Sequence, residues 1–507
     1  MSNRQGFVSM NSNQLKNQHL LWRAGFGPAA DQVYHIRHLT PKKLFRLILR
    51  SANNDPVPFD VATLSLNALV MEKGDNGFPK RGELSPEEKK NFRRQSVLDI
   101  KTLNLHWLQE MTDGEAQLRE KMALFWHGHF ASKTVNIFYD QALLNIIRQH
   151  ALGNFRDLLF KVSKSASMIR FLNNNQNKKD HPNENFAREL MELFTMGRGN
   201  YTEHDVKESA RAFTGWGTTL QGAFEFRKRQ HDDDGKTFLG KTGNLSGEDV
   251  LDILLSKKQT AVFITRKIYR FFVNDQADES RVNALAEDFY QNKYDILKLM
   301  VAIFSSDWFY DEKNIGTHIK SPVEWLVGIR RQLPQDFENP DVQILIQRLL
   351  GQVLFNPPNV AGWPGGKRWI DSSSLMLRLR IPQIMYASDA ILMRPKDDDD
   401  LMMGMKDRAT GANRQSGPME RMEAQQSSAK NRAGQIIRTK IHWETFLDHF
   451  RDSSDEDLLA NIQELLLQSN TSMAEAGMKK YLDQSSRNTM IQSAAIRFMS
   501  TPEYQLC

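Results

Sequence analysis

The chain has 507 residues, of which 40% are hydrophobic and 25% charged, a composition typical of folded globular proteins and unlike that of disordered chains. No apolar run is long enough to span a bilayer, and the first residues lack the apolar core of a secretory signal, so the chain as written is expected to be cytoplasmic. The net charge of +6 gives little support to a nucleic-acid partner, and the single cysteine, Cys507, excludes an internal disulfide and a thiolate metal cluster.

Helical periodicity dominates the chain and predicts a mainly α fold, an irregular multi-helix domain with one small β-hairpin and long Pro/Gly loops. We expect a main helical domain over residues 1–393 and a helical segment over 437–507 that packs on it. Residues 394–436 are rich in Lys, Asp, Gly, Gln and Ser and hold no aromatic residue, so they are expected to form a polar, disordered linker or insertion.

The first candidate functional residues lie at the end of the predicted helix EAQLREKMALFWHGHF, which arrives at His127-Gly128-His129. On a continuous helix, two histidines two positions apart point about 200° away from each other. Gly128 offers a natural helix end, beyond which both imidazoles could turn to one side. The pair is then either half of a metal or proton-transfer site, or two separate histidines that bind backbone groups.

The most ordered polar pattern lies in residues 181–217. At about 100° per residue, one helix from residue 184 to 195 separates an apolar face from a polar ridge. This ridge is either a solvated, salt-bridged face or the wall of a pocket in which a carboxylate acts as an acid or base or binds a metal. The polar residues of the helix are Glu184, Asn185, Arg188, Glu189 and Glu192.

The β-hairpin is expected where Phe224 and Phe226 alternate with polar neighbours and KTFLG follows the turn HDDDG. Turn chemistry explains the aspartates, and a Ca²⁺ or Mg²⁺ site is the alternative. His231 and Asp232 are site candidates because adjacent imidazole and carboxylate groups can tune one another's protonation.

Further residues could form the wall of a pocket. Asn183 lies in the loop that leads into the ridge helix and Asn185 in the first turn of that helix, and Trp216 follows the end of the next helix. The Pro- and Gly-rich segment 354–371 carries Trp363 and Trp369. These tryptophans either line a ligand site or fill the core at a chain crossing.

Several segments together resemble the bacterial family catalogued as domain of unknown function 1800, over roughly residues 14–392 and again at the chain end FMSTPEYQL. The segments follow one another in the family's order: HLLWRAGFGP, LFWHGHFAS, NENFARELMELFTMGRGNYTEHDV, ARAFTGW, HDDDGKTFLG, RKIYRFFV, KSPVEWLVGIRR and LFNPPNVAGWPGGKRWID. The resemblance implies a mostly helical bacterial protein, often exported and often encoded beside a partner similar to sulfatases and alkaline phosphatases. The chain as written departs from the exported pattern because it lacks a signal.

Recurrence of these motifs favours a shared polar pocket. Our first hypothesis places His127, His129 and His231 against the Glu184–Glu192 ridge, as an acid/base centre of unresolved reaction class in which Arg188 binds an anionic substrate group. A metal in this pocket would be a divalent transition ion such as Zn²⁺, Fe²⁺ or Mn²⁺, with His127, His129, Glu189 and His231 as ligands.

The second hypothesis makes the protein a non-catalytic helical binding or assembly factor for the sulfatase-like partner. The ridge is then an internal salt-bridge network. The two hypotheses differ in geometry, since a catalytic site requires the histidines and the ridge to converge on one accessible cleft. Nucleic-acid binding has only dispersed basic residues in its favour, and the chain contains no Gly-rich phosphate loop or nucleophile elbow.

Overall fold

The structure is a computed structural model that describes residues 12–32, 36, 38–63, 66, 85–219, 222–387, 390–391, 435–469 and 478–507. The linker or insertion expected over residues 394–436 lies outside these ranges, except for its last two residues. The α-helices are α1 (Ser12–Arg23), α3 (Pro41–Ala52), α5 (Pro86–Asp113), α6 (Gln117–His129), α7 (Ile137–His150), α8 (Phe155–Ser163), α9 (Ala166–Phe171), α10 (Asn185–Glu189), α11 (Glu203–Ala212), α12 (Gly247–Leu255), α13 (Lys258–Phe272), α14 (Glu279–Gln291), α15 (Ile296–Phe304), α16 (Pro322–Gln332), α17 (Asp341–Leu350), α18 (Ser372–Ala387), α21 (Glu444–Asp448), α22 (Leu458–Leu466) and α24 (Arg487–Met499).

The remaining elements are short. A π-helix, η2 (Leu190–Thr195), continues α10, and the 3₁₀ turns are η1 (Asn174–Gln176), η3 (Lys228–Gln230), η4 (Asp307–Tyr310), η5 (Gly366–Trp369) and η6 (Glu503–Gln505). The strands are β1 (Trp216–Thr218), β2 (Phe224–Phe226), β3 (Lys236–Phe238), β4 (Lys241–Gly243), β5 (Gln335–Phe337), β6 (Ala390–Ile391), β7 (Gln435–Ile436) and β8 (Thr439–Ile441).

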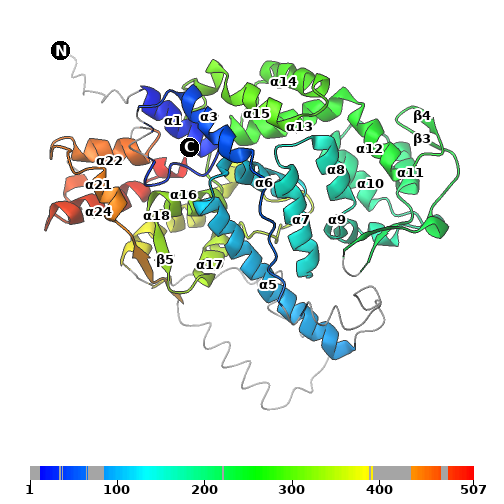
Figure 1. Ribbon diagram of the computed structural model, residues 1–507, viewed down its shortest axis with the longest axis horizontal. Helices are drawn as coiled ribbons and strands as arrows, with labels where there is room; N and C mark the ends of the chain where they lie inside the picture. Colours follow the sequence, from blue (N-terminus) through cyan, green and yellow to red (C-terminus); the bar gives the residue numbers. More distant parts are fainter. Residues whose placement is uncertain are drawn as a thin grey trace.

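The predicted mainly α fold is confirmed, because the β structure of the described residues consists of small two-stranded antiparallel sheets. Figure 1 shows α21, α22 and α24 at one end of the molecule, and α11, α12, β3 and β4 at the other. The long helix α5 runs outward from the middle. In the described part of the chain, no helix combines the length and the apolar character needed to cross a membrane.

The expected hairpin across the HDDDG turn is wrong. β2 pairs with β1, which places Phe226 opposite Trp216, whereas β3 pairs with β4. Leu239 and Gly240 both have positive φ angles, of 46° and 84°. Two such residues form the tight turn that suits a two-residue hairpin loop, so β3 folds back on the residues that follow it.

Helix starts follow the sequence signals closely. Ser85, Thr202 and Ser321 each form a capping box with the acidic residue three positions later, and each immediately precedes a helix. Two of these helices, α5 and α16, also have proline in the first turn, where a missing N–H is tolerated.

The helix α6 lies in the interior of the fold. Nearly every residue from Leu118 to His129 is buried, and the helix packs against α3, α5 and α7. Its apolar side chains belong to a cluster of buried residues that runs from α1 to the chain end. A helix buried on all sides must satisfy its polar side chains inside the protein, and this requirement shapes the sites described below.

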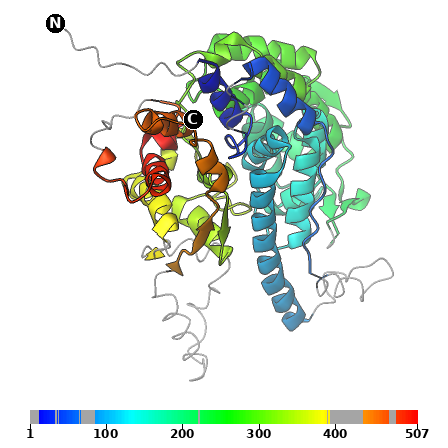
Figure 2. The ribbon, with the colours of Figure 1, turned by 60° about the vertical axis from the view of Figure 1, so that its left-hand side comes forward.

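The C-terminal segment contacts the main helical body at several points. β8 pairs with β5, with Ile441 opposite Gln335, and α24 packs against α18. Leu506 forms a β-bridge with Ile319, just before α16. In Figure 2 the orange and red C-terminal helices lie beside the yellow and yellow-green helices that precede them in the chain.

Candidate functional site

His127 is buried against aromatic rings. Its ring centroid lies 5.1 Å from Trp107, 5.0 Å from Phe355 and 5.3 Å from Trp363. The backbone N–H of Phe355 donates to Nε2 at 3.1 Å, and Phe355 has a φ of 64°, which is unusual for a bulky residue. Burial lowers the pKa of His127 to about 3, so the imidazole is neutral near pH 7. It anchors the Pro/Gly segment to α6.

His129 faces another part of the molecule. Its Nε2–H donates to the Phe194 carbonyl at 3.2 Å, and its Nδ1 accepts from the Lys267 ammonium at 2.9 Å. Lys267 also donates to the Leu193 carbonyl at 3.3 Å. These carbonyls belong to the last turn of η2, where backbone oxygens lack partners within the helix. His129 and Lys267 therefore cap the π-helix, and burial lowers the pKa of Lys267 to about 8.

The expected helix end at Gly128 is the reason the pair was predicted to converge. Instead α6 continues through Gly128 to His129, and Phe130 caps it by donating to the Trp126 carbonyl. The two imidazoles consequently keep the divergent directions of positions two apart on a helix.

The predicted ridge is altered by the change from α- to π-helix at Leu190. The N–H of Met196 donates to the Met191 carbonyl, an i→i+5 bond that adds a residue to the turn. On a continuous α-helix Glu184, Arg188 and Glu192 would stand at i, i+4 and i+8, and the π-helix interrupts that spacing before Glu192. Arg188 binds Glu203 through two hydrogen bonds of 2.7 and 2.8 Å and Glu184 through one of 3.1 Å.

The other two glutamates of the ridge have different surroundings. Glu192 accepts hydrogen bonds from Arg198 and Tyr201, at 3.1 and 3.0 Å. Partial burial, together with the charge of Glu192, raises the pKa of Glu189. The ridge is thus a half-exposed ion-pair network and does not face the three histidines.

His231 and Asp232 also have separate partners. The Nδ1–H of His231 donates to the Thr214 carbonyl at 2.8 Å. Asp232 binds the Arg211 guanidinium through bonds of 2.7 and 3.2 Å. Burial acts to raise the pKa of Asp232, but these hydrogen bonds lower it overall. Both side chains hold the turn after η3 against the end of α11.

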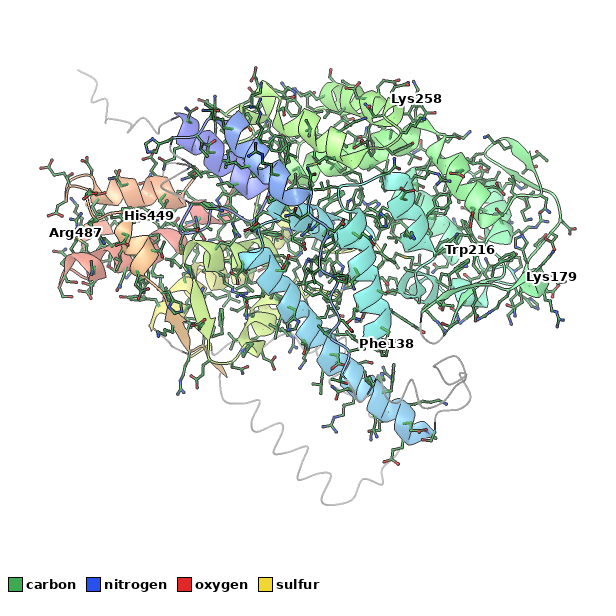
Figure 3. All side chains as sticks on the ribbon, in the orientation of Figure 1. Phe138, Lys179, Trp216, Lys258, His449 and Arg487 are labelled. Atoms are coloured by element: carbon green, nitrogen blue, oxygen red, sulfur yellow. The ribbon has the colours of Figure 1, made fainter. Side chains whose placement is uncertain are left out.

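The predicted wall residues are dispersed as well. The side-chain oxygen of Asn183 accepts from the backbone N–H of Asn185, and the backbone N–H of Asn183 donates to the side chain of Asn177. The side chain of Asn185 donates to the Leu172 carbonyl. Trp216 packs on Phe213 and Phe224 and lies at the opposite end of the molecule from His449 in Figure 3. Of the two tryptophans in the Pro/Gly segment, Trp363 contacts His127 and Trp369 is buried.

The predicted metal set of His127, His129, Glu189 and His231 is not assembled. Across the residues that the structure describes, no group of three or more His, Cys, Asp or Glu side chains is arranged to hold a metal ion. The physical reason is that each imidazole already binds a backbone group of a different element.

Sequence reasoning missed a buried chain of charged residues between α6 and α16. Lys121 forms an ion pair with Glu324, and the other oxygen of Glu324 lies 3.4 Å from Nε2 of His318. Nδ1 of His318 lies 3.7 Å from the half-buried Asp275. Burial acts to raise the pKa of Glu324, but Lys121 and His318 hold it well below its usual range. The Ser321 capping box was the readable signal, because Glu324 is its third helical residue.

A cleft of about 630 Å³ was missed too. It lies where the end of α5, the end of α16 and the β5–β8 pair meet. Ionisable residues from these elements and from the loop after α1 line it: Asp31, Asp113, Glu115, Arg330, Arg331, Asp336 and His442. The visible signal was the adjacent Arg330-Arg331 at the end of an apolar helix, where the helix dipole favours cations.

The two arginines of the cleft are buried and held by the protein. Arg331 donates to the carbonyls of Gly27 and Thr112, at 3.0 and 2.5 Å. Burial lowers the pKa of Arg331 to about 10, against the opposing effect of Asp31 and Asp113. Arg330 donates to two glutamine side chains, at 2.8 and 2.6 Å.

Gln335 is the exceptional residue of the cleft wall. It exposes only 8% of its surface, and neither polar atom of its amide has a hydrogen-bond partner among the described residues. Buried amides in folded proteins are normally paired, because an unmade hydrogen bond there is unfavourable. Both atoms of the amide are themselves buried, so the cleft wall holds an unpaired donor and an unpaired acceptor just below its surface.

Comparison with known proteins gives one match. Residues 19–506, nearly the whole chain, match the family described as Protein of unknown function (DUF1800). Neither the curated proteins nor the solved structures contain a match to this chain.

Proposed function

Because the chain belongs to the family described as Protein of unknown function (DUF1800), whose description assigns no activity, we propose a function from the geometry: a non-catalytic helical binding or assembly factor. Its binding site in this proposal is the cleft between α5, α16 and the β5–β8 pair. The observation that carries the proposal is the unpaired, buried amide of Gln335 in the wall of that cleft.

The amide supports a binding role for an energetic reason. A buried polar group without a partner costs about 1–3 kcal/mol of stability. Both atoms of the amide are buried in the free protein, so a partner pairs with them only by opening the cleft wall. Such a partner removes the penalty in the complex alone, which stabilises the complex relative to the free protein. A volume of about 630 Å³ lies within the range of sites that hold a ligand or an inserted segment of a partner.

The positions of the histidines support the same choice. An acid/base centre needs its imidazoles within reach of one reacting atom. His127, His129 and His231 instead bind Phe355, Phe194 and Thr214, which belong to three separate segments. The ridge of Arg188 is occupied by its own ion pairs.

The proposed partner is a protein similar to sulfatases and alkaline phosphatases. The family resemblance implies that such a protein is often encoded beside members of this family. The cleft is suited to a protein partner because its walls come from both the main helical body and the C-terminal segment. A partner seated there would contact both.

The test is to co-express the chain with the sulfatase-like protein encoded beside it and to measure the complex by light scattering and calorimetry. We expect a complex that Gln335→Leu weakens at least tenfold, which corresponds to about 1.4 kcal/mol. The control is Lys258→Gln, in an exposed ion pair with Glu287 on another face of the molecule (Figure 3). No complex, or one that responds equally to both substitutions, would contradict the proposal.

A further inference from the structure

A small pocket opens between the middle of α5, the loop before α7, α17 and the segment that follows α17. Its volume is about 50 Å³. Figure 1 shows the yellow-green α17 beside the blue α5, and the two helices pack against each other. This pocket is separate from the cleft of the proposed function, because the two have no lining residue in common.

The walls of the pocket are mainly aliphatic. Val97 and Ile100 contribute from α5, Ile344 from α17, and Val353 and Leu354 from the segment after α17. A water-sized group needs about 10–15 Å³ of such space, so the pocket holds roughly four of them. It therefore suits a branched aliphatic side chain and is too small for a long acyl chain.

One wall is fixed to the rest of the fold by hydrogen bonds. The backbone N–H of Leu354 donates to the side-chain oxygen of Gln347 at 3.1 Å, and that of Phe355 donates to Nε2 of His127 at 3.1 Å. Leu354 and Phe355 both line the pocket. A wall held in this way needs little reordering when a ligand binds, which lowers the entropic cost of binding.

The charged residues of the lining are all cationic. Lys101 of α5 and Lys133 of the loop line the pocket, and among the described residues no Asp or Glu does so. Each ammonium is joined to the lining by a stem shorter than the Debye length of about 8 Å at physiological ionic strength, so both charges act on the mouth. Partial burial lowers the pKa of Lys133, because its ammonium has lost part of its hydration. Both lysines therefore favour an anion at the mouth.

Apolar surface continues beyond the pocket. Val135 lines the pocket and exposes 41% of its surface. Leu98 exposes 47% and lies three residues before Lys101 on α5, so the two side chains are neighbours on the helix surface. A free short-chain acid would fill the pocket and leave this surface uncovered. The last residues of a polypeptide would cover it where the chain leaves the pocket.

We propose that the pocket binds the carboxyl terminus of a partner protein whose last residue is leucine, isoleucine or valine. The aliphatic side chain fills the pocket, and the terminal carboxylate lies at the mouth near Lys101 and Lys133. The residues before it lie along Val135 and Leu98. The pocket adds a second binding site to the cleft of the proposed function and does not depend on that cleft.

The test is a calorimetric titration of the full chain with acetylated pentapeptides of glycine and serine that end in leucine. We expect the peptide with a free carboxylate to bind at least tenfold more tightly than its C-terminal amide. It should also bind at least tenfold more tightly than a free-acid peptide that ends in glycine. Because salt screens the lysines, 0.5 M NaCl should reduce the first difference and leave the second.

Variants assign the binding to the pocket. Val135→Trp, at an exposed position, should block the mouth and abolish binding. Lys101→Gln should reduce the preference for the free acid at least threefold, and Lys101→Arg should preserve it. The matched control is Lys90→Gln, at an exposed position on the same side of α5, three turns and about 16 Å from Lys101. It should bind the leucine peptide as the natural chain does, and circular dichroism would verify that all variants are folded.

Several results would overturn the inference. The leucine peptide might fail to bind, or bind no better than its amide or the glycine peptide. Tighter binding of decanoate would identify an acyl chain as the ligand, and equally tight binding of 3-methylbutanoate would identify a free short-chain acid. An equal response of Lys90→Gln and Lys101→Gln would show a general effect of charge in place of a site.

Discussion

At the scale of single residues, we expect the unpaired amide of Gln335 to lower the stability of the free protein and to strengthen binding of the partner. Gln335→Met keeps the side-chain length and removes both unpaired polar atoms. We expect this substitution to raise the free energy of unfolding by about 1–3 kcal/mol, because the penalty for the unpaired amide disappears. Thermal denaturation followed by circular dichroism would measure it. The same variant should bind the partner at least tenfold more weakly, and a loss of stability would show that the amide has a structural role.

Asp140 provides a pH-dependent prediction at the same scale. Its carboxyl is fully buried, accepts hydrogen bonds from Thr134 and Ser167, and has its pKa raised by burial to about 7. Between pH 4 and 7 the folded state therefore holds a proton that the unfolded state has released. Stability must fall as pH rises through this window, by at most about 1.4 kcal/mol per pH unit from this group.

The check is urea denaturation of the natural chain and of Asp140→Asn at pH 5 and pH 8. We expect the variant to lose less stability than the natural chain between these two pH values, because its amide does not titrate. Equal losses would contradict the assignment of the titration to Asp140.

At the scale of elements, two glycines at the contact between α6 and the Pro/Gly segment should respond in opposite ways. A Cβ on Gly128 meets nothing within 4 Å, so Gly128→Ala should stabilise α6 by roughly 0.5–1 kcal/mol. A Cβ on Gly362 would lie 2.4 Å from the Gly128 carbonyl, and its φ is 82°. Gly362→Ala should therefore destabilise the protein and displace the segment from His127. Denaturation midpoints, with hydrogen exchange at Phe355, would test both.

The sequence permitted prediction of elements whose signals are local. Ser85, Thr202 and Ser321 are each followed three positions later by Glu or Asp, a local pattern that marks the three helix starts found in the structure. The turn at Leu239–Gly240 was not recognised, because positive φ at a leucine has no signal in the residue type. The π-helix was also missed, since its extra residue per turn depends on the Lys267 and His129 side chains that bind its last carbonyls.

The candidate site was harder to predict because its residues are distant in sequence. Asp31, Asp113, Arg331 and His442 meet only through tertiary packing. The histidines were chosen as candidates because their residue type suits catalysis. Only the folded structure shows that their ring nitrogens are hydrogen-bonded to backbone groups. Residue type indicates which chemistry is available, and packing decides where it is used.

At the scale of the whole molecule, the buried pair Lys121–Glu324 joins α6 to α16 across the centre of the fold. Lys121→Met leaves Glu324 charged and buried without its ion-pair partner, although His318 and the Ser321 N–H still contact it. We expect a loss of about 3–5 kcal/mol in the free energy of unfolding. The double variant Lys121→Met/Glu324→Leu should recover much of this loss, and denaturant titration of the three proteins would measure the difference. Equal losses for the single and double variants would contradict the expected coupling.

The pairing of β5 with β8 has a consequence for the time at which the cleft can exist in a cell. More than a hundred residues separate Gln335 from His442 and Thr445, so the second wall of the cleft is synthesised well after the first. A nascent chain halted before residue 435 has the helices of the main body but only one side of the cleft. Because the cleft needs both sides, binding competence is delayed until synthesis has passed β8, and truncated translation products cannot compete for the partner.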